Sequence, residues 1–229
     1  MSGTPNGHRD EAPEGRVALR RKRTEDEIVA AAWDLVHEHG LGSLSMRDLG
    51  DRVGMKAQSL YSYFASKNDI YDAMFREGQI AFAATMTITP DDLGGDESPQ
   101  AELRLACHRF FEYCTSDTAR YQLMFQRVIP DFVPSPQTYE LAVETLGLAR
   151  ERMRAAGLDS DRDLDLWTAI LTGLVDQQIS NDPGGDRWAR LIDDCVAMFL
   201  AYCQQPAPAT KRRKSNRTHK SSTNKGARP

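Results

Sequence analysis

The feature that most constrains the fold of this chain is the spacing of its apolar residues, which recur every three to four positions along most of its length. The clearest stripe runs through Ile28, Ala31, Ala32, Leu35 and Val36. This period places apolar side chains on one face of an α-helix, and no stretch shows the apolar–polar alternation of a half-buried strand. The sequence therefore predicts an all-α fold of about nine helices.

Local signals indicate where these helices begin and end. A hydroxyl residue followed three positions later by an acidic residue, the capping-box pattern, occurs at Thr24, Ser45, Ser66 and Ser160. Glycine follows the apolar period at positions 40, 54 and 157, as is common at helix C-termini. We expect helices over residues 24–39, 45–53, 57–64, 66–85, 98–114, 118–128, 139–156, 160–180 and 186–205.

The proline- and glycine-bearing segment TITPDDLGGDESP, residues 87–99, divides these helices into two groups. We expect a small N-terminal domain over residues 23–83 and a larger helical domain over residues 84–205. The leader, residues 1–22, is polar and ends in basic residues, and the tail, residues 206–229, has no apolar residue larger than alanine or proline. Both are predicted to be disordered, because they offer little apolar surface to bury.

Charge is distributed unevenly, although the net charge of the chain is only −4. Residues 80–205 hold 10 basic and 20 acidic residues, whereas the tail holds eight Lys and Arg and no acid. The run RRKR, Arg20–Arg23, lies just before the first apolar stripe. A nucleic-acid partner is therefore compatible with the N-terminal domain and the tail, but not with the acidic middle of the chain.

Several protein classes are disfavoured by what the sequence lacks. The N-terminus has no apolar core of a signal peptide, and the longest apolar stretch, Cys195–Cys203, is too short to cross a bilayer. We therefore expect a cytoplasmic protein with no membrane partner. HExxH, GxSxG, P-loop and GxGxxG motifs are missing, so no enzyme activity, catalytic residue, metal site or cofactor is predicted.

The cysteines are interpreted as buried core thiols. Cys107 and Cys114 are seven residues apart, and Cys195 and Cys203 are eight apart, so each pair falls on one helical face. No CxxC spacing is present, and a reducing compartment argues against disulfides. A redox role for these thiols is left open.

Residues 45–64 form two short amphipathic runs joined at a glycine, and a longer helix precedes them. This pattern predicts a helix-turn-helix, in which the second helix enters the major groove of DNA. The apolar residues expected to face inward are Leu49, Val53, Met55 and Leu60, and those left for a partner are Gln58, Ser59, Tyr61, Ser62 and Tyr63. The alternative is that these runs are two surface helices of an ordinary bundle.

The segment Ile28–Phe75 resembles the DNA-binding domain of the TetR/AcrR family of transcriptional regulators. The resemblance is carried by Ala31-Ala32, Gly40, Ser45, Leu49, Val53-Gly54, Leu60-Tyr61, Phe64 and Ser66-Lys67. Three departures bear on the operator sequence and not on the DNA-binding role, one being Tyr63-Phe64 in place of the family's common aromatic-His-Phe ending. Lys56 stands where the family usually has Ser or Thr, and the base-reading region lacks arginine.

The resemblance implies DNA contacts from Ser45, Arg47, Lys56, Gln58, Ser59, Tyr61, Tyr63 and Lys67. Ser45 and Arg47, at a helix start, would hold phosphates together with free backbone N–H groups, and Lys67 would neutralise a further phosphate. Gln58 and Ser59 would hydrogen-bond to base edges. The two tyrosines would contact the DNA backbone or a thymine methyl group, and Phe64 is expected in the core.

Arg21 and Arg23 belong to the basic run before the first predicted helix. They are predicted to lie along the DNA backbone or to reach the minor groove. The competing interpretation is a solvated charge run with no DNA contact.

The resemblance also implies that residues 84–205 form a ligand-binding and dimerisation domain. The predicted ligand-binding residues are Phe110, Tyr113, Tyr121, Phe125, Trp167 and Gln177. The last two long helices, residues 160–180 and 186–205, would pair with their copies in a homodimer, although internal core is the competing interpretation of their apolar faces. A small-molecule effector would then release the dimer from a palindromic operator.

The predicted function is therefore sequence-specific regulation of transcription, as a repressor released by its ligand. The alternative is a helical small-molecule-binding or interaction protein whose DNA-reading head is weak or lost. Activation instead of repression remains open, as do the two interpretations of the tail, which either adds non-specific DNA affinity or only keeps the protein soluble.

Overall fold

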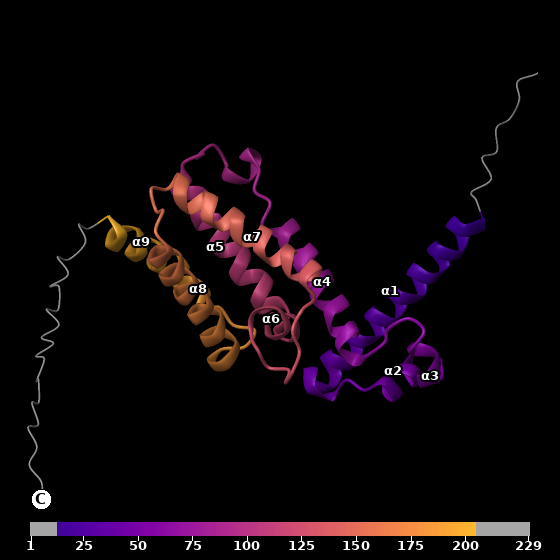
Figure 1. Ribbon diagram of the computed structural model, residues 1–229. Coiled ribbons are helices and arrows are strands. Elements are labelled where there is room, and N and C mark those ends of the chain that lie inside the picture. Colours follow the sequence, from indigo (N-terminus) through magenta and orange to yellow (C-terminus); the bar gives the residue numbers. More distant parts are fainter. Residues whose placement is uncertain (1–12, 205–229) are drawn as a thin grey trace, which may run out of the picture.

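The computed structural model describes residues 13–204 (Figure 1), and within that range the chain folds into nine α-helices with no β-strand. The predicted all-α fold is confirmed. The helices are α1 (Pro13–His39), α2 (Met46–Arg52), α3 (Ala57–Leu60), α4 (Lys67–Thr85), α5 (Pro99–Ser116), α6 (Thr118–Phe125), α7 (Pro136–Ala155), α8 (Asp161–Asn181) and α9 (Ile192–Cys203). Short 3₁₀ turns occupy Leu41–Ser43, Pro90–Leu93 and Ala189–Leu191. The tail, residues 206–229, and the first twelve residues of the leader lie outside the described range, so their predicted disorder stays a prediction.

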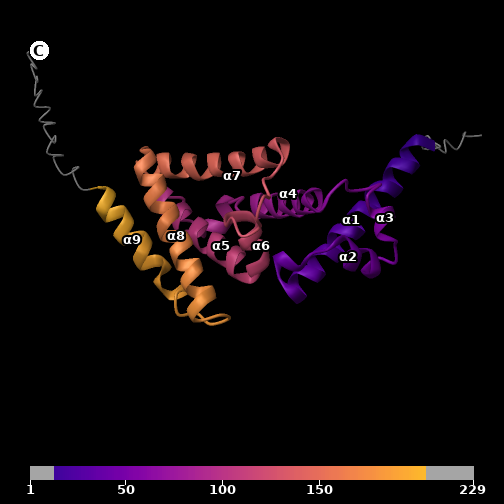
Figure 2. The same cartoon turned by 60° about the horizontal axis from the view of Figure 1, so that its bottom comes forward.

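The elements form two groups joined by α4. Figures 1 and 2 show α1, α2 and α3 together at one end, while α5 to α9 form a larger helical body at the other. Helix α4 runs from the small group into the body, and α7 lies alongside it in both views. The small group also contacts the body directly, because Nε2 of His37 on α1 lies 3.0 Å from Oδ2 of Asp117, between α5 and α6.

The capping signals in the sequence explain most helix starts. The Ser66 hydroxyl accepts a hydrogen bond from the Asp69 backbone N–H, and the Asp69 carboxylate accepts one from the Ser66 backbone N–H, which is the full capping box. At Ser45 and Ser160 the hydroxyl likewise accepts from the backbone N–H three residues later. Ser98 does the same ahead of Pro99, the first residue of α5.

The start of the first helix was predicted wrongly. We expected a disordered leader up to residue 22, but α1 begins at Pro13, so residues 13–22 are helical. The cause lies in pairs four residues apart: Arg21–Glu25, Lys22–Asp26 and Arg23–Glu27 all form ion pairs at 2.9–3.1 Å. Each such pair stabilises a continuous helix, and the Thr24 hydroxyl donates to the Arg20 carbonyl instead of capping a new start.

Three other helices are shorter than predicted, among them α6, which ends at Phe125 and not at residue 128. Helix α3 ends at Leu60 and not at residue 64, and the backbone continues in turns in which Tyr63 and Phe64 both donate to the Leu60 carbonyl. Helix α9 begins at Ile192 and not at residue 186, because a 3₁₀ turn precedes it.

Each group of helices buries its apolar stripes. In the small group Ile28, Ala32, Leu49, Leu60 and Ile70 are completely buried. Phe64 is also buried, as the sequence analysis expected. In the body, residues such as Leu103, Met153 and Val175 are similarly enclosed. None of the helices within residues 13–204 is long and apolar enough to serve as a membrane span.

Candidate DNA-reading surface and ligand cavity

The turn between α2 and α3 depends on two glycines. Gly54 adopts a positive φ of 69°, which favours glycine, and it reverses the chain. Gly50, within α2, accepts a hydrogen bond from the Met55 N–H at 2.8 Å. A Cβ atom at Gly50 would lie 2.7 Å from the Met55 carbonyl oxygen. The close approach of the two helices therefore requires glycine at position 50, a requirement that the sequence analysis did not identify.

The structure brings most predicted DNA-binding residues onto one exposed region. Arg47 on α2 is exposed, and so are Lys56, Gln58, Ser59 and Tyr61 in and around α3. The Tyr61 side chain is 49% exposed, although it is large and mostly apolar. Exposed polar and aromatic groups on a helix as short as α3 add little to a core, so these side chains are available to a partner.

Three further predicted residues lie at the edges of this region. Ser45 caps α2, with its hydroxyl donating to Oδ2 of Asp48 at 2.6 Å. Lys67 is the first residue of α4, and its Nζ lies 5.7 Å from the ring centre of Tyr71. These two residues place a hydroxyl and a cation at the N-termini of α2 and α4, where free backbone N–H groups attract anions.

Arg21 contacts the turn that follows α3. Its Nη2 donates to the Ser62 carbonyl at 2.9 Å, and its guanidinium lies 5.1 Å from the ring centre of Tyr63. Arg21 therefore supports the C-terminal side of the reading helix and holds Tyr63 half-buried. Arg23 differs, because its side chain is 82% exposed and pairs only with Glu27 on its own helix.

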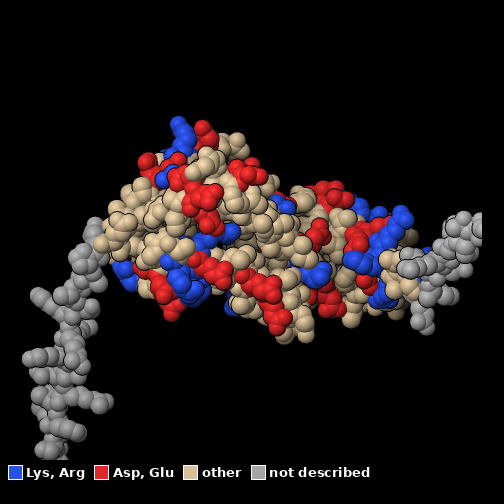
Figure 3. All heavy atoms as spheres, turned by 90° about the horizontal axis from the view of Figure 1, so that it is seen from above, with Lys and Arg blue, Asp and Glu red and all other residues tan. Residues whose placement is uncertain are grey.

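Basic residues gather at the end of the molecule where the described chain begins. Figure 3 shows Lys and Arg beside the grey N-terminal residues, with acidic residues interspersed. The basic residues of α1 there include Arg20, Arg21, Lys22 and Arg23, all exposed. Three of them are paired with acids four residues later, so the field of this run is weaker than its sequence suggests.

The helical body contains a cavity of about 800 Å³, partly open to solvent, which is lined by residues of α4, α5, α6, α7 and α8. Of the predicted ligand-binding residues, Phe110, Phe125 and Trp167 line it. The rings of Phe110 and Phe125 pack on each other and on Phe82, with centroids 5.4–5.9 Å apart. An apolar cavity of this size is typical of sites for small organic molecules.

The other three predicted ligand-binding residues do not line the cavity. The buried hydroxyl of Tyr113 donates to the Gly78 carbonyl at 2.7 Å, and burial raises the pKa of Tyr113 to about 12. The hydroxyl of Tyr121 donates to Asp176 at 2.9 Å, and burial followed by this carboxylate raises the pKa of Tyr121. Gln177 is exposed and accepts from Asn181 on the same helix. These residues hold helices together or face outward.

The sequence analysis missed several residues of the cavity wall. On α7 the apolar residues Tyr139, Val143 and Leu146 line the cavity while remaining 45–57% exposed. Their helical spacing can be read from the sequence, but the same spacing is expected for residues of the hydrophobic core and for residues that line a ligand cavity. Arg152, also on α7, and Arg127 line the cavity too. A charged residue in an amphipathic helix ordinarily indicates a solvent face, so no sequence signal marked these arginines.

Helix α7 is tied to α4 near both of its ends. At its N-terminus, Asp72 of α4 accepts from the Ser135 N–H at 2.7 Å, the Ser135 hydroxyl at 2.9 Å and the Thr138 hydroxyl at 2.8 Å. At its C-terminal side, Nη2 of Arg152 donates to the Met86 carbonyl at 2.6 Å. The cavity lies between these two attachments.

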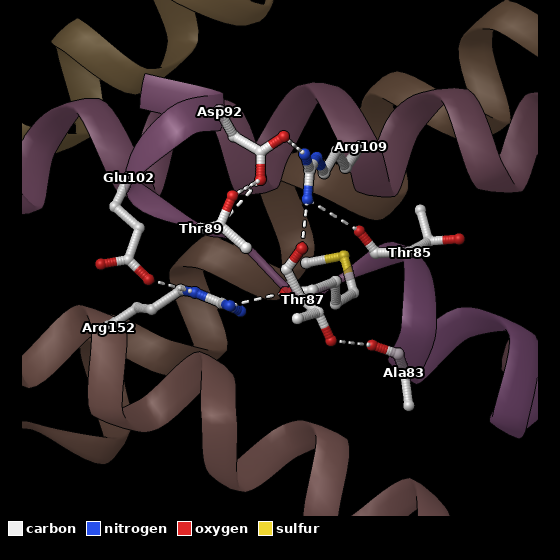
Figure 4. A network of polar contacts seen from close by, with 9 residues as sticks. Ala83, Thr85, Thr87, Thr89, Asp92, Glu102, Arg109 and Arg152 are labelled. Carbon is white, nitrogen blue, oxygen red and sulfur yellow. Dashed lines mark hydrogen bonds and ion pairs between the residues drawn. The ribbon is translucent and has the colours of Figure 1, made fainter. Parts of the chain in front are cut away.

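A second arginine, Arg109, also binds the C-terminal end of α4 (Figure 4). Arg109 of α5 donates to the carbonyls of Thr85 and Thr87, on either side of Met86. Asp92 pairs with Arg109 at 2.6 Å, and hydrogen bonds from Thr89 and then the Arg109 charge hold the pKa of Asp92 below its usual range. Cations at the C-terminal carbonyls of a helix offset its dipole, so α4 is fixed where it enters the body.

The last helix, α9, and the turn before it keep an outward apolar stripe. Leu191, Met198 and Tyr202 are spaced at one helical face and are 38%, 64% and 46% exposed. Trp167 of α8 and Phe199 of α9 pack inward, with ring centroids 4.9 Å apart. Helix α9 therefore packs its inner side against α8, while its outer side and the turn before it leave apolar surface exposed.

No group of three or more metal-ligating side chains is present within residues 13–204. Cys107 and Cys114 are buried, and burial raises the pKa of both thiols. A thiol with a raised pKa forms little thiolate and reacts slowly. Cys195 and Cys203 are half-buried.

The fold and its two sites define a class of protein: a helix-turn-helix domain joined by one long helix to a cavity-bearing helical body. Residues 28–74 match the sequence model described as "Bacterial regulatory proteins, tetR family". The segment of residues 28–74 is therefore a DNA-binding domain of the TetR family of bacterial regulatory proteins. The family resemblance predicted from the sequence is confirmed.

Individual relatives agree with this assignment. An HTH-type transcriptional regulator of Saccharopolyspora erythraea is 40% identical over 60 residues, which are 26% of this chain and 25% of that protein. The HTH-type transcriptional activator FasR of Mycolicibacterium smegmatis is 25% identical over 123 residues, 52% of each protein. The chain thus spans a quarter to about half of the length of these curated relatives.

The fold extends beyond these matched segments. The solved structure of the fatty acid degradation regulator FadR from Bacillus halodurans aligns with a TM-score of 0.60 and 17% identity, covering 84% of this chain and 97% of that one. This likeness supports the arrangement of both helical groups. The family and the matched relatives are transcriptional regulators and not enzymes, as the sequence analysis predicted.

Proposed function

We propose that the protein is a sequence-specific DNA-binding regulator of transcription, a repressor that leaves its operator when a small molecule enters the cavity of the helical body. The observation that carries this proposal is the set of exposed side chains on and beside α3, held on a buried three-helix scaffold. Such a regulator acts on the chromosome, so the proposal includes a cytoplasmic location.

The proposed contacts follow the geometry of the reading region. Gln58, Ser59 and Tyr61 lie on and just after α3, the helix that enters the major groove in this motif. Ser45, Arg47 and Lys67 flank it at the starts of α2 and α4, where phosphates bind. Lys56 precedes α3 and adds a cation near the same phosphates. Arg21 acts through Ser62 and Tyr63, which it supports.

A homodimer supplies the specificity that one short helix lacks. Four residues of α3 read too few base pairs for a unique site, whereas a two-fold pair reads two half-sites of a palindrome. The outward stripe of Leu191, Met198 and Tyr202 on α9 and its neighbouring turn is the surface that we assign to this pairing.

Release by a ligand follows from the position of the cavity. The cavity touches α4, and α4 carries the reading domain. A molecule that binds better to one position of α4 shifts the population towards it, and so changes the spacing of the two reading domains. The relative FasR is named an activator, which favours activation as the second candidate outcome of the same DNA binding.

Selection of random duplex DNA on the purified chain tests the proposal. We expect enrichment of a palindrome with two half-sites. Tyr61→Ala should weaken binding to it by about 1–3 kcal/mol, and Lys67→Ala should lower the slope of log affinity against log salt by about one. Arg154→Ala, an exposed charge on α7 far along the chain, is the matched control and should change neither.

The contrary result is equally clear. In that case the selection enriches no sequence, and the remaining DNA binding is lost at moderate salt or on removal of the tail. That result would mean that the helix-turn-helix domain does not recognise a DNA sequence. The protein would then be a small-molecule-binding or interaction protein. Reporter expression from the selected site, with and without the chain, separates repression from activation.

A further inference from the structure

The charged residues that line the cavity are both arginines, although one of them is paired with Glu102 behind the wall. Of the described residues that line it, only Arg127 and Arg152 carry a charge, and no Asp or Glu is among them. Most other lining side chains are aliphatic or aromatic. A cationic ligand would therefore meet like charge and no partner, whereas an anion would meet two guanidinium groups.

Arg152 is the more strongly constrained of the two. Its side chain is only 11% exposed. Nε donates to Oε1 of Glu102 at 2.7 Å, and Nη2 donates to the Met86 carbonyl at 2.6 Å. Nη1, however, is buried and has no hydrogen-bond acceptor among the described residues. An unmet donor on a buried guanidinium is costly, and an acceptor on a bound molecule would remove that cost.

We propose that the cavity binds an apolar molecule bearing a single anionic group of the carboxylate type, and that Arg152 is the anchor for that group. This inference rests on the proposed function, in which the cavity is the effector site. The carboxylate accepts from Nη1 of Arg152, the donor that is left without a partner on a residue that lines the cavity. The apolar remainder of the ligand lies against Phe110, Phe125 and Trp167.

The same arginine links the ligand to the reading domain. Arg152 holds the Met86 carbonyl, directly after α4, while Arg109 holds the carbonyls on either side of it. A ligand carboxylate at Nη1 pulls the guanidinium away from the Met86 carbonyl that Nη2 holds, because a charged acceptor attracts a guanidinium more strongly than a neutral carbonyl does. Binding of an apolar acid therefore loosens one of the attachments that fix α4, and a neutral molecule of the same shape does not.

A matched pair of probes tests the anchor. Decanoate and decan-1-ol have the same chain length and differ in charge, and Trp167 in the cavity wall reports their binding by its fluorescence. In the full chain we expect decanoate to bind more tightly than decan-1-ol. Arg152→Met should weaken decanoate binding about 10- to 100-fold, the effect of losing a charge-assisted hydrogen bond, and leave decan-1-ol binding nearly unchanged.

Two further variants keep the test decisive. Arg150→Met removes an exposed guanidinium from the same helix, which pairs with Asp161, and should leave both probes unaffected. Glu102→Gln removes the carboxylate that competes for Arg152 and should tighten decanoate binding, so the proposal remains testable if Arg152→Met fails to fold. Equal affinity of the two probes for the unaltered chain, failure of decanoate to bind, or equal losses for both probes in Arg152→Met would overturn the inference.

These measurements need no DNA, so they separate the inference from the proposed function. If the chain binds decanoate through Arg152 but selects no operator, the proposed function as a DNA-binding regulator is contradicted. The inference that Arg152 binds the carboxylate is then kept. An operator-binding chain that does not distinguish the two probes would contradict the anchor alone.

Discussion

At the scale of single residues, the lack of a side chain at Gly50 allows α2 and the start of α3 to approach closely. The carbonyl of Met55 occupies the space that a Cβ would need, at 2.7 Å. The two helices of the reading motif therefore approach through backbone and not through side chains. The position of every exposed residue on α3 depends on this contact.

We expect Gly50→Ala to destabilise the protein by about 1–3 kcal/mol, because the added methyl group must push α3 away from α2. Urea unfolding followed by circular dichroism measures this loss. Gly42→Ala is the control, because a Cβ there would have no heavy atom within 4 Å. A Gly50→Ala protein as stable as the control would mean that the turn adjusts freely.

Individual residues also show which features of the structure could be predicted from the sequence and which could not. Ser45, Ser66 and Ser160 cap helices as their spacing predicted, because capping is decided within four residues. The cavity wall could not be predicted in the same way. Phe110 and Tyr113 are one helical turn apart on α5, yet only Phe110 lines the cavity, because the packing of α4 and α6 decides which side of α5 is filled.

At the scale of elements, competition between local signals explains the errors in helix bounds. Thr24 has the sequence of a helix start, but three ion pairs and strong helix formers carry α1 through it. Helix α3 was overestimated for the opposite reason. Its tyrosines and serines favour turns over a continued helix once Leu60 is buried.

The attachment of α7 to α4 gives a prediction at this scale. Asp72→Ala removes the acceptor of three hydrogen bonds from Ser135 and Thr138. We expect a loss of about 1–3 kcal/mol of stability, because two hydroxyls and a backbone N–H lose their charged acceptor. Amide hydrogen exchange should show the first turn of α7 opening more often.

Glu77→Ala, an exposed acid on the same helix, is the control for this variant and should leave exchange in α7 unchanged. If both variants behave alike, the contacts of Asp72 do not hold α7 in place, and the cavity has only the Arg152 attachment.

At the scale of the whole molecule, the proposed homodimer uses the outward face of α9. Met198 is 64% exposed in the single chain. A carboxylate at the centre of an apolar interface is strongly unfavourable. Met198→Asp should therefore raise the dimer dissociation constant by at least about 100-fold while each chain stays folded.

Sedimentation velocity over a range of concentrations measures this change. Val128→Asp places the same charge on another exposed apolar position, 45% exposed and outside α8 and α9, and should sediment like the unaltered chain. A Met198→Asp protein that remains dimeric would show that the chains pair through a different surface.

The unexpected length of α1 has a mechanical consequence. With 27 residues, α1 is a rod of about 40 Å at 1.5 Å per residue. A rotation of its domain by only about 5° sweeps the far end of such a rod through about 3 Å. Arg16 and Arg20, near that end, thus travel farther than side chains close to α4. Because of this N-terminal extension, a small rotation of the domain produces a large displacement of the first residues of α1.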